Sequence, residues 1–84
     1  MTHRSRNDLI SDILKAANGR GATRTKIMYR AFLGYDKLKD HLTVLTQTDL
    51  LRYDLDKQTF KTTEKGLRFL DAYNHMDAVM KAKK

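Results

Sequence analysis

The sequence predicts a mainly α-helical fold with one two-stranded β-hairpin, in the order α-α-α-β-β-α. Apolar residues recur with the 3.6-residue period of an amphipathic helix in three segments before residue 50. The period changes to that of β-strands over residues 51–62, and a further helical segment follows. A chain of 84 residues holds one hydrophobic core, so we expect a single domain over residues 1–84.

The first helix is expected over residues 7–17. Asn7 is a suitable N-cap, and Asp8 lies near the positive end of the helix dipole. Asn18 and Gly19 form a typical C-terminal signal. The apolar face consists of Leu9, Ile10, Ile13, Leu14 and Ala17.

Two further helices are expected at about residues 24–32 and 35–48, joined by a tight turn at Leu33 and Gly34. Thr23 or Thr25 can cap the first of them. Helices joined by so short a turn cross steeply, as in a helix-turn-helix. The inward residues are expected to be Ile27, Met28, Ala31 and Phe32 in one helix, and Tyr35, Leu38, Leu42 and Leu45 in the other.

The hairpin is expected to pair residues 50–55 with residues 59–62 across a polar turn. Leu51, Tyr53 and Leu55 alternate along the first strand and should share one face. The last helix begins at Thr62 or Thr63 and continues to about Lys81. Gly66 is costly near a helix start, which indicates close packing or the approach of another backbone there.

This element order is that of a winged helix-turn-helix, in which the hairpin is the wing. Residues 7–62 would form the winged helix-turn-helix itself, and residues 63–82 a C-terminal helix for dimerisation. A three-helix bundle with an incidental hairpin is the alternative.

Composition limits the possible functions. The net charge of +7 and the pI of about 9.9 favour a polyanionic partner, most often nucleic acid. The sequence has no cysteine and only scattered histidines, which argues against a thiolate or zinc site and fits a reducing compartment. No nucleophile–base pattern or phosphate-binding glycine loop is present, so we expect no enzyme activity, no cofactor and no small-molecule ligand. Neither a secretory signal nor a membrane span is evident, and we expect a cytoplasmic, nucleoid-associated protein.

The helix after the tight turn is the expected DNA-reading helix. In a helix-turn-helix, this second helix enters the major groove with its N-terminal residues leading. Lys37 and Lys39 can reach guanine edges or phosphates, while Thr43 and Gln47 can hydrogen-bond to bases. Asp36 and Asp40 lie among them and repel phosphates.

Phosphate contacts are expected from the preceding helix and from the wing. Thr25 offers a hydroxyl and a backbone amide near a helix start. The expected cations are Arg24, Lys26 and Arg30 on the helix and Arg52 and Lys57 on the wing. An ordinary solvated surface is the alternative for such residues.

The last helix carries a possible dimer interface. Its apolar residues are spaced four, three and four apart, which is a heptad seam: Phe69, Tyr73, Met76 and Met80. We expect this stripe to pair with a second copy of the chain. The alternative is a helix folded back onto its own domain.

Several segments together resemble the small archaeal winged-helix DNA-binding proteins, which are predicted transcriptional regulators and include ten-kilodalton chromatin-type proteins. The matching segments are TKIMYRAFLGY at 25–35 and TTEKGLRFLDAY at 62–73, with weaker matches at 10–19 and 42–51. The resemblance implies a dimer formed by an antiparallel coiled coil of C-terminal helices. It also implies that Thr25, Tyr29 and the segment from Tyr35 to Lys39 lie at or beside the DNA. Gly34 stands where the family usually has serine, which weakens the cap of the reading helix.

We therefore expect a homodimeric winged-helix protein that binds double-stranded DNA, either as a transcriptional regulator or as a nucleoid-associated protein. The alternative is a winged-helix module that binds protein or RNA, which the aspartates of the reading helix favour.

Overall fold

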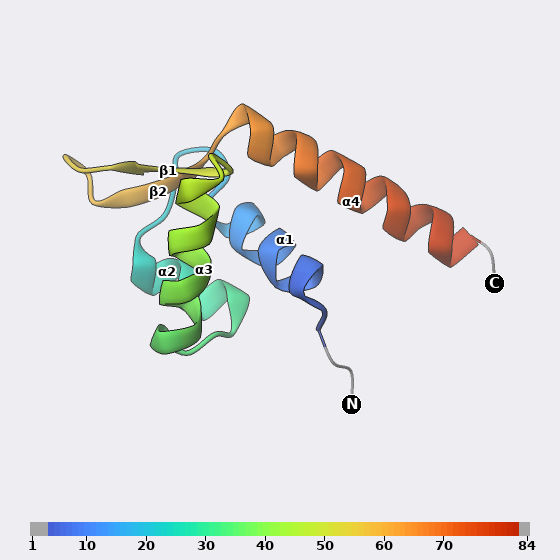
Figure 1. Ribbon diagram of the computed structural model, residues 1–84, viewed down its shortest axis with the longest axis horizontal. Coiled ribbons are helices and arrows are strands. Elements are labelled where there is room, and N and C mark those ends of the chain that lie inside the picture. The colour runs from blue at the N-terminus through green and yellow to red at the C-terminus, as the bar shows by residue number, and fades with distance from the viewer. Residues whose placement is uncertain (1–3, 83–84) are drawn as a thin grey trace.

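The computed structural model describes the backbone of residues 4–82 and side chains as far as residue 76. The elements follow the expected order and form a winged helix (Figure 1). Three helices come first, then a hairpin and a long final helix: α1 (Arg6–Ala16), α2 (Arg24–Ala31), α3 (Tyr35–Gln47), β1 (Leu51–Asp54), β2 (Thr59–Thr62) and α4 (Glu64–Ala82). The expected fold class is thus confirmed, and the incidental hairpin on a three-helix bundle is set aside.

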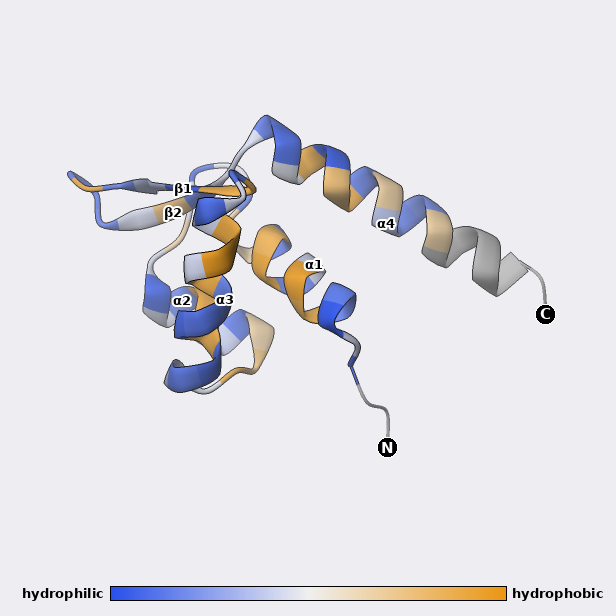
Figure 2. Ribbon diagram, in the orientation of Figure 1, coloured by the Kyte–Doolittle hydropathy of each residue, from blue (hydrophilic) through white to orange (hydrophobic). Residues whose placement is uncertain are grey.

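The core lies where the first three helices meet the base of the hairpin. Hydrophobic residues of α3 gather on the side that faces α1 (Figure 2). The hairpin and α4 each close one edge of this core, through Phe60 and Leu70. The largest side chains in it that are almost entirely buried are Ile13, Leu14, Ile27, Leu38, Leu45 and Leu51.

Helix α1 starts one residue earlier than expected, and its N-cap is Ser5 rather than Asn7. The Asp8 amide donates to Ser5 Oγ at 3.1 Å, and the Ser5 amide donates to Asp8 Oδ2 at 3.0 Å. This reciprocal pair is a capping box, with aspartate in place of the usual glutamate or glutamine. The choice of Asn7 was wrong because Ser5 and Asp8 together satisfy two amides, whereas Asn7 alone could satisfy one.

Three residues of the expected apolar faces are exposed. Phe32 and Tyr35 were expected to face inward, and Leu55 was expected to share a strand face with Leu51 and Tyr53. Phe32 is 84% exposed and adopts a left-handed backbone conformation as the C-cap of α2. Tyr35 is 45% exposed, and Leu55 is 78% exposed at the tip of the hairpin. Each lies at the end of an element, where the sequence period continues but the surface that the element packs against has ended.

The hairpin is antiparallel and pairs Leu51 with Thr62 and Tyr53 with Phe60. Asp54 Oδ1 accepts hydrogen bonds from the amides of Asp56 and Lys57, which stabilises the turn. Ala22, in the loop before α2, exchanges two backbone hydrogen bonds of 2.8 Å with Phe60. The wing is therefore fastened to the start of α2.

The junction between the hairpin and α4 is tightly packed. Thr63 Oγ1 donates to the Asp49 carbonyl and accepts from the Gly66 amide, so Thr63 both caps α4 and ties it to the end of α3. A Cβ atom on Gly66 would lie 2.5 Å from the Leu50 carbonyl oxygen. The expected close approach at Gly66 is confirmed.

Helix α4 then runs past α1 and contacts it (Figure 1). Leu70 of α4 is buried in the core. No helix in the described part of the chain is both long enough and apolar enough to cross a membrane.

Candidate nucleic-acid interface

The exposed side of α3 carries all the residues expected to reach the major groove. Leu38, Leu42 and Leu45 point into the core, which leaves the opposite side free. The exposed residues on that side are Tyr35, Asp36, Lys37, Lys39, Asp40, Thr43 and Gln47. Thr43 Oγ1 donates to the Lys39 carbonyl at 3.0 Å, and while this bond is kept the hydroxyl can accept from a base.

Arg24 connects the start of α2 to the first turns of α3. Its guanidinium carbon lies 5.5 Å from the centre of the Tyr35 ring, which is a cation–π contact. Arg24 also lines a small hollow with Lys39, Thr43 and Phe60. One arginine thus places positive charge beside three residues of α3.

A second hollow lies between the N-terminus of α2 and the wing. Thr23, Arg24 and Thr25 line one side, and Tyr53, Lys57, Gln58 and Phe60 line the other. Thr23 Oγ1 accepts from the Lys26 amide at 3.2 Å. The amides of Arg24 and Thr25 have no partner within the helix, as at any helix start. Phosphate-sized anions are favoured at such a place, with arginine and lysine on its two sides.

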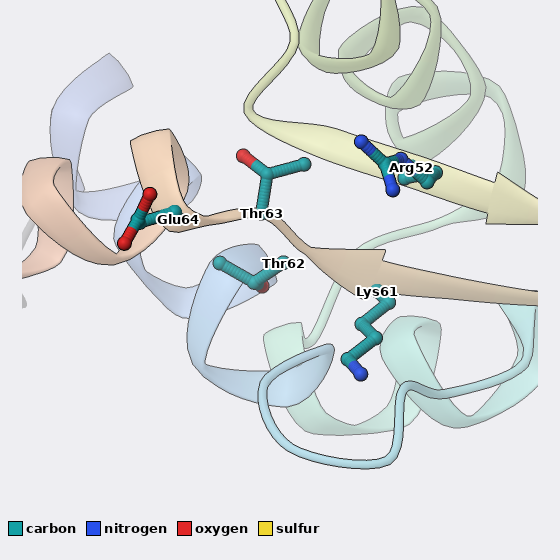
Figure 3. Close-up of a pocket in the computed structure, with 5 residues that line it drawn as sticks. All are labelled: Arg52, Lys61, Thr62, Thr63 and Glu64. Atoms are coloured by element: carbon teal, nitrogen blue, oxygen red, sulfur yellow. The ribbon is translucent and has the colours of Figure 1, made fainter.

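The remaining expected phosphate contacts lie elsewhere. Lys26 and Arg30 are four residues apart on one exposed side of α2. Arg52 lies on the outer face of the hairpin, because the alternating residues Tyr53 and Phe60 face α2. Arg52 and Lys61 both line a hollow at the base of the wing. Their cationic side chains point away from each other (Figure 3). The structure thus brings Arg24 together with Thr25 and Lys57 in one hollow and with Lys39 in another. Lys26, Arg30 and Arg52 line neither hollow.

Sequence reasoning missed two contributors to the hollow between α2 and the wing. Tyr53 was expected only to share a strand face with Leu51 and Leu55; it is 39% exposed and stacks at a tilt on Phe60, with ring centres 4.7 Å apart. Gln58 was assigned only to the turn, where it adopts a positive φ of 53°. Strand alternation gave the correct face for Tyr53, but not its distance from the core.

The expected dimer stripe on α4 is partly covered by the chain's own α1. Phe69 packs against the edge of the core, and the Tyr73 hydroxyl donates to Asp8. Met76 is 65% exposed, and the side chain of Met80 lies outside the described residues. The alternative of a helix folded back on its domain therefore applies to the first half of α4.

Asp8 is a titratable group with a clear perturbation. The hydrogen bond from Tyr73, followed by that from the Ser5 amide, lowers the pKa of Asp8 below its ordinary value. Asp8 lies on α1, and none of the contacts that lower its pKa comes from α2, α3 or the wing. Its perturbation therefore concerns the attachment of α4 and not the candidate interface. Among the described residues, no group of three or more histidine, cysteine, aspartate or glutamate side chains could hold a metal ion.

Comparisons with known proteins agree with this architecture. The model of a winged helix-turn-helix family matches residues 3–81. The crystal structure of Sso10a-2, a DNA-binding protein from Sulfolobus solfataricus, superimposes with a TM-score of 0.81 over 94% of this chain and 84% of that chain, at 18% identity. No curated protein matches in sequence. The family match covers almost the entire chain, and this protein belongs to the winged helix-turn-helix family.

Proposed function

We propose that this protein binds double-stranded DNA, with α3 in the major groove and the wing beside the adjacent backbone. The observation that carries the proposal is the position of Arg24, which lines one hollow with Lys39 of α3 and a second hollow with Lys57 of the wing. A structurally similar protein of the same fold is described as DNA-binding. Binding is non-enzymatic and requires no cofactor.

Within this proposal the residues divide into two roles. Tyr35, Lys37, Lys39, Thr43 and Gln47 face the groove. Phosphates of the strand nearest the wing enter the hollow lined by Arg24, Thr25 and Lys57. Lys26, Arg30 and Arg52 lie outside this hollow and contribute mainly through longer-range attraction.

The test is a charge reversal on α3. The double variant Lys37→Glu, Lys39→Glu should weaken duplex binding by at least about tenfold at moderate salt, since it removes up to two phosphate-neutralising groups and adds repulsion. The control is Lys15→Glu, Arg68→Glu, which changes the net charge equally at exposed positions on α1 and α4. Fluorescence anisotropy with a labelled duplex measures both. Equal weakening in the two variants would mean that net charge, and not α3, governs binding.

We further propose that two copies act together, joined through α4, so that paired reading helices face one side of the DNA. Such a dimer is suited to a transcriptional regulator or a nucleoid-associated protein. Selection of bound sequences from random duplexes separates these roles. A regulator enriches a palindrome with half-sites about one helical turn apart, whereas a nucleoid protein enriches none.

One observation favours a second candidate, a module that binds protein or RNA. Asp36 and Asp40 lie one helical turn apart on the exposed side of α3, where they oppose phosphates. Titration of the same protein with duplex DNA and with duplex and single-stranded RNA of matched length discriminates the two. Tighter binding to either RNA than to the DNA would favour the second candidate.

A further inference from the structure

The Arg4 side chain, just before α1, is hydrogen-bonded to the turn of the helix-turn-helix. Arg4 Nη1 donates to the Ala31 carbonyl at 2.6 Å, and Arg4 Nη2 donates to the Phe32 carbonyl at 3.2 Å. Nη1 also lies 2.9 Å from Asp12 Oδ2, forming an ion pair. The guanidinium therefore joins α1 to the last residues of α2.

The two carbonyls belong to the C-terminal end of α2. The last carbonyls of a helix lack partners within it and carry the negative end of its dipole, so a cation there is favourable. Phe32 ends α2 in the left-handed conformation, at φ 54°, without being glycine. On the other side of the turn, Gly34 gives α3 no side-chain cap. The Arg4 guanidinium reaches this turn from just before the start of α1 and hydrogen-bonds to the Ala31 and Phe32 carbonyls.

Arg4 is itself held in place from two directions. The capping box of Ser5 and Asp8 fixes the backbone immediately after it. Asp12, one turn further along α1 from Asp8, orients the guanidinium. The Arg4 side chain is one-third exposed, with a relative accessibility of 33%. It is thus a preorganised clamp rather than a free surface cation.

We infer that Arg4 is a positioning residue for DNA reading: it fixes the turn at residues 32–34 and so sets the direction in which α3 enters the groove. This inference rests on the proposed function. Arg4 acts on α3 through the turn and does not neutralise a phosphate. Loss of the clamp leaves the contact residues in place but adds freedom that binding must then remove.

Phosphate contact and positioning differ in their salt dependence. Each phosphate neutralised contributes about 0.9 to the slope of log K against log salt concentration. A positioning residue contributes to affinity but not to this slope. Arg4→Ala should therefore weaken duplex binding about five- to tenfold, by loss of preorganisation, with an unchanged slope. Arg4→Lys should not restore it, because an ammonium cannot supply the planar fork that reaches two carbonyls and Asp12.

Arg6→Ala is the matched control, because Arg6 is an exposed cation two residues away that makes none of these contacts. It removes the same charge and should change affinity less than twofold. A slope that falls by about one in Arg4→Ala would identify a phosphate contact and overturn the inference. Equal loss in Arg4→Ala and Arg6→Ala would also overturn it.

A measurement without DNA checks the turn directly. The Leu33 amide donates to the Met28 carbonyl, and the Leu38 amide donates to the Gly34 carbonyl. Both amides should exchange with solvent faster in Arg4→Ala and in Asp12→Asn than in Arg6→Ala. Unchanged exchange would overturn the clamp. A wild-type protein that binds no duplex overturns the proposed function, whereas a wild type and an Arg4→Ala variant that bind equally overturn this inference alone.

Discussion

Asp8 shows how one side chain can serve two elements. Its Oδ2 atom accepts from the Ser5 amide and completes the cap of α1. Its Oδ1 atom accepts from the Tyr73 hydroxyl, more than sixty residues further along the chain. The start of α1 and the middle of α4 are therefore joined at a single carboxylate, and its ionisation affects both.

This arrangement predicts acid-dependent loss of stability. The folded pKa of Asp8 is lowered, so its contribution is fully present above the unfolded value of about 4 and is lost as the pH falls through the folded value. Asp8→Asn should lower the melting temperature between pH 5 and 8, and the difference from wild type should shrink below about pH 4. Calorimetry across this range measures it.

Asp71→Asn is the control for this experiment, since Asp71 is an exposed carboxylate on α4. Tyr73→Phe should lower the melting temperature at neutral pH and bring the pKa of Asp8 closer to its ordinary value. A gap between wild type and Asp8→Asn that persists unchanged to pH 2 would show that the carboxylate charge does not stabilise the fold.

At the scale of elements, the close packing of α4 against the end of the loop that precedes β1 requires a glycine at position 66. Alanine at position 66 would gain up to about 1 kcal/mol in helix propensity. Its Cβ atom, however, would lie 2.5 Å from the Leu50 carbonyl oxygen and 2.6 Å from Thr62 Cγ2. That oxygen cannot easily move, because it accepts the Thr63 amide at 3.1 Å. Overpacking costs about 1–3 kcal/mol, so the packing term should win.

Gly66→Ala should therefore destabilise the protein by about 1–2 kcal/mol, seen as a melting temperature lower by roughly 4–16 °C. Gly34→Ala is the comparison, because nothing lies within 4 Å of its added Cβ atom and its φ is −74°. That change should cost less than Gly66→Ala, because its one penalty is that alanine is a poorer N-cap than glycine. A Gly66→Ala protein as stable as wild type would mean that α4 can shift away from β1 without loss.

The elements also show what the sequence could predict. Helical period placed Ile13, Ile27 and Leu38 correctly, because each lies mid-helix with a packing surface on one side. The same period failed for Phe32 and Tyr35, because a pattern in sequence does not state where the opposing surface ends. Strand alternation had the same limit at Leu55. At Tyr53, strand alternation predicted the correct face but did not predict that the side chain is 39% exposed.

The sequence named individual residues of the candidate interface but did not show which of them lie together in space. Sequence alone named Arg24, Thr25 and Lys57 among the phosphate contacts, yet it could not separate them from Arg52. That separation depends on the register of the hairpin and on which of its faces meets α2. Arg4 gave no signal, because its partners Ala31 and Phe32 contribute backbone carbonyls that any residues would supply.

At the scale of the whole molecule, the candidate interface and the proposed dimer surface lie on different elements. The candidate interface is made by α2, α3 and the wing, whereas α4 leaves the domain from the base of the hairpin and extends beyond α1 (Figure 1). The first half of α4 is anchored by Leu70 and Tyr73. Beyond that anchor, Met76 is the described apolar residue with the largest exposure on α4. The distal part of the helix is therefore the region available to a second copy.

The last prediction concerns this distal part of α4. Met76→Lys places a charge on the expected seam, where burial against a partner helix would desolvate it, so the dimer should dissociate. Because Met76 is 65% exposed in the single chain, the fold itself should be little affected. Leu55→Lys is the matched control, since Leu55 is 78% exposed and the wing tip lies on the opposite side of the molecule from the distal part of α4 (Figure 1). Sedimentation equilibrium at micromolar concentration should give a dimer for wild type and Leu55→Lys, and a monomer for Met76→Lys and for Met76→Lys, Met80→Lys. A wild-type protein that sediments as a monomer would contradict the seam, and paired reading helices would then have to assemble on the DNA.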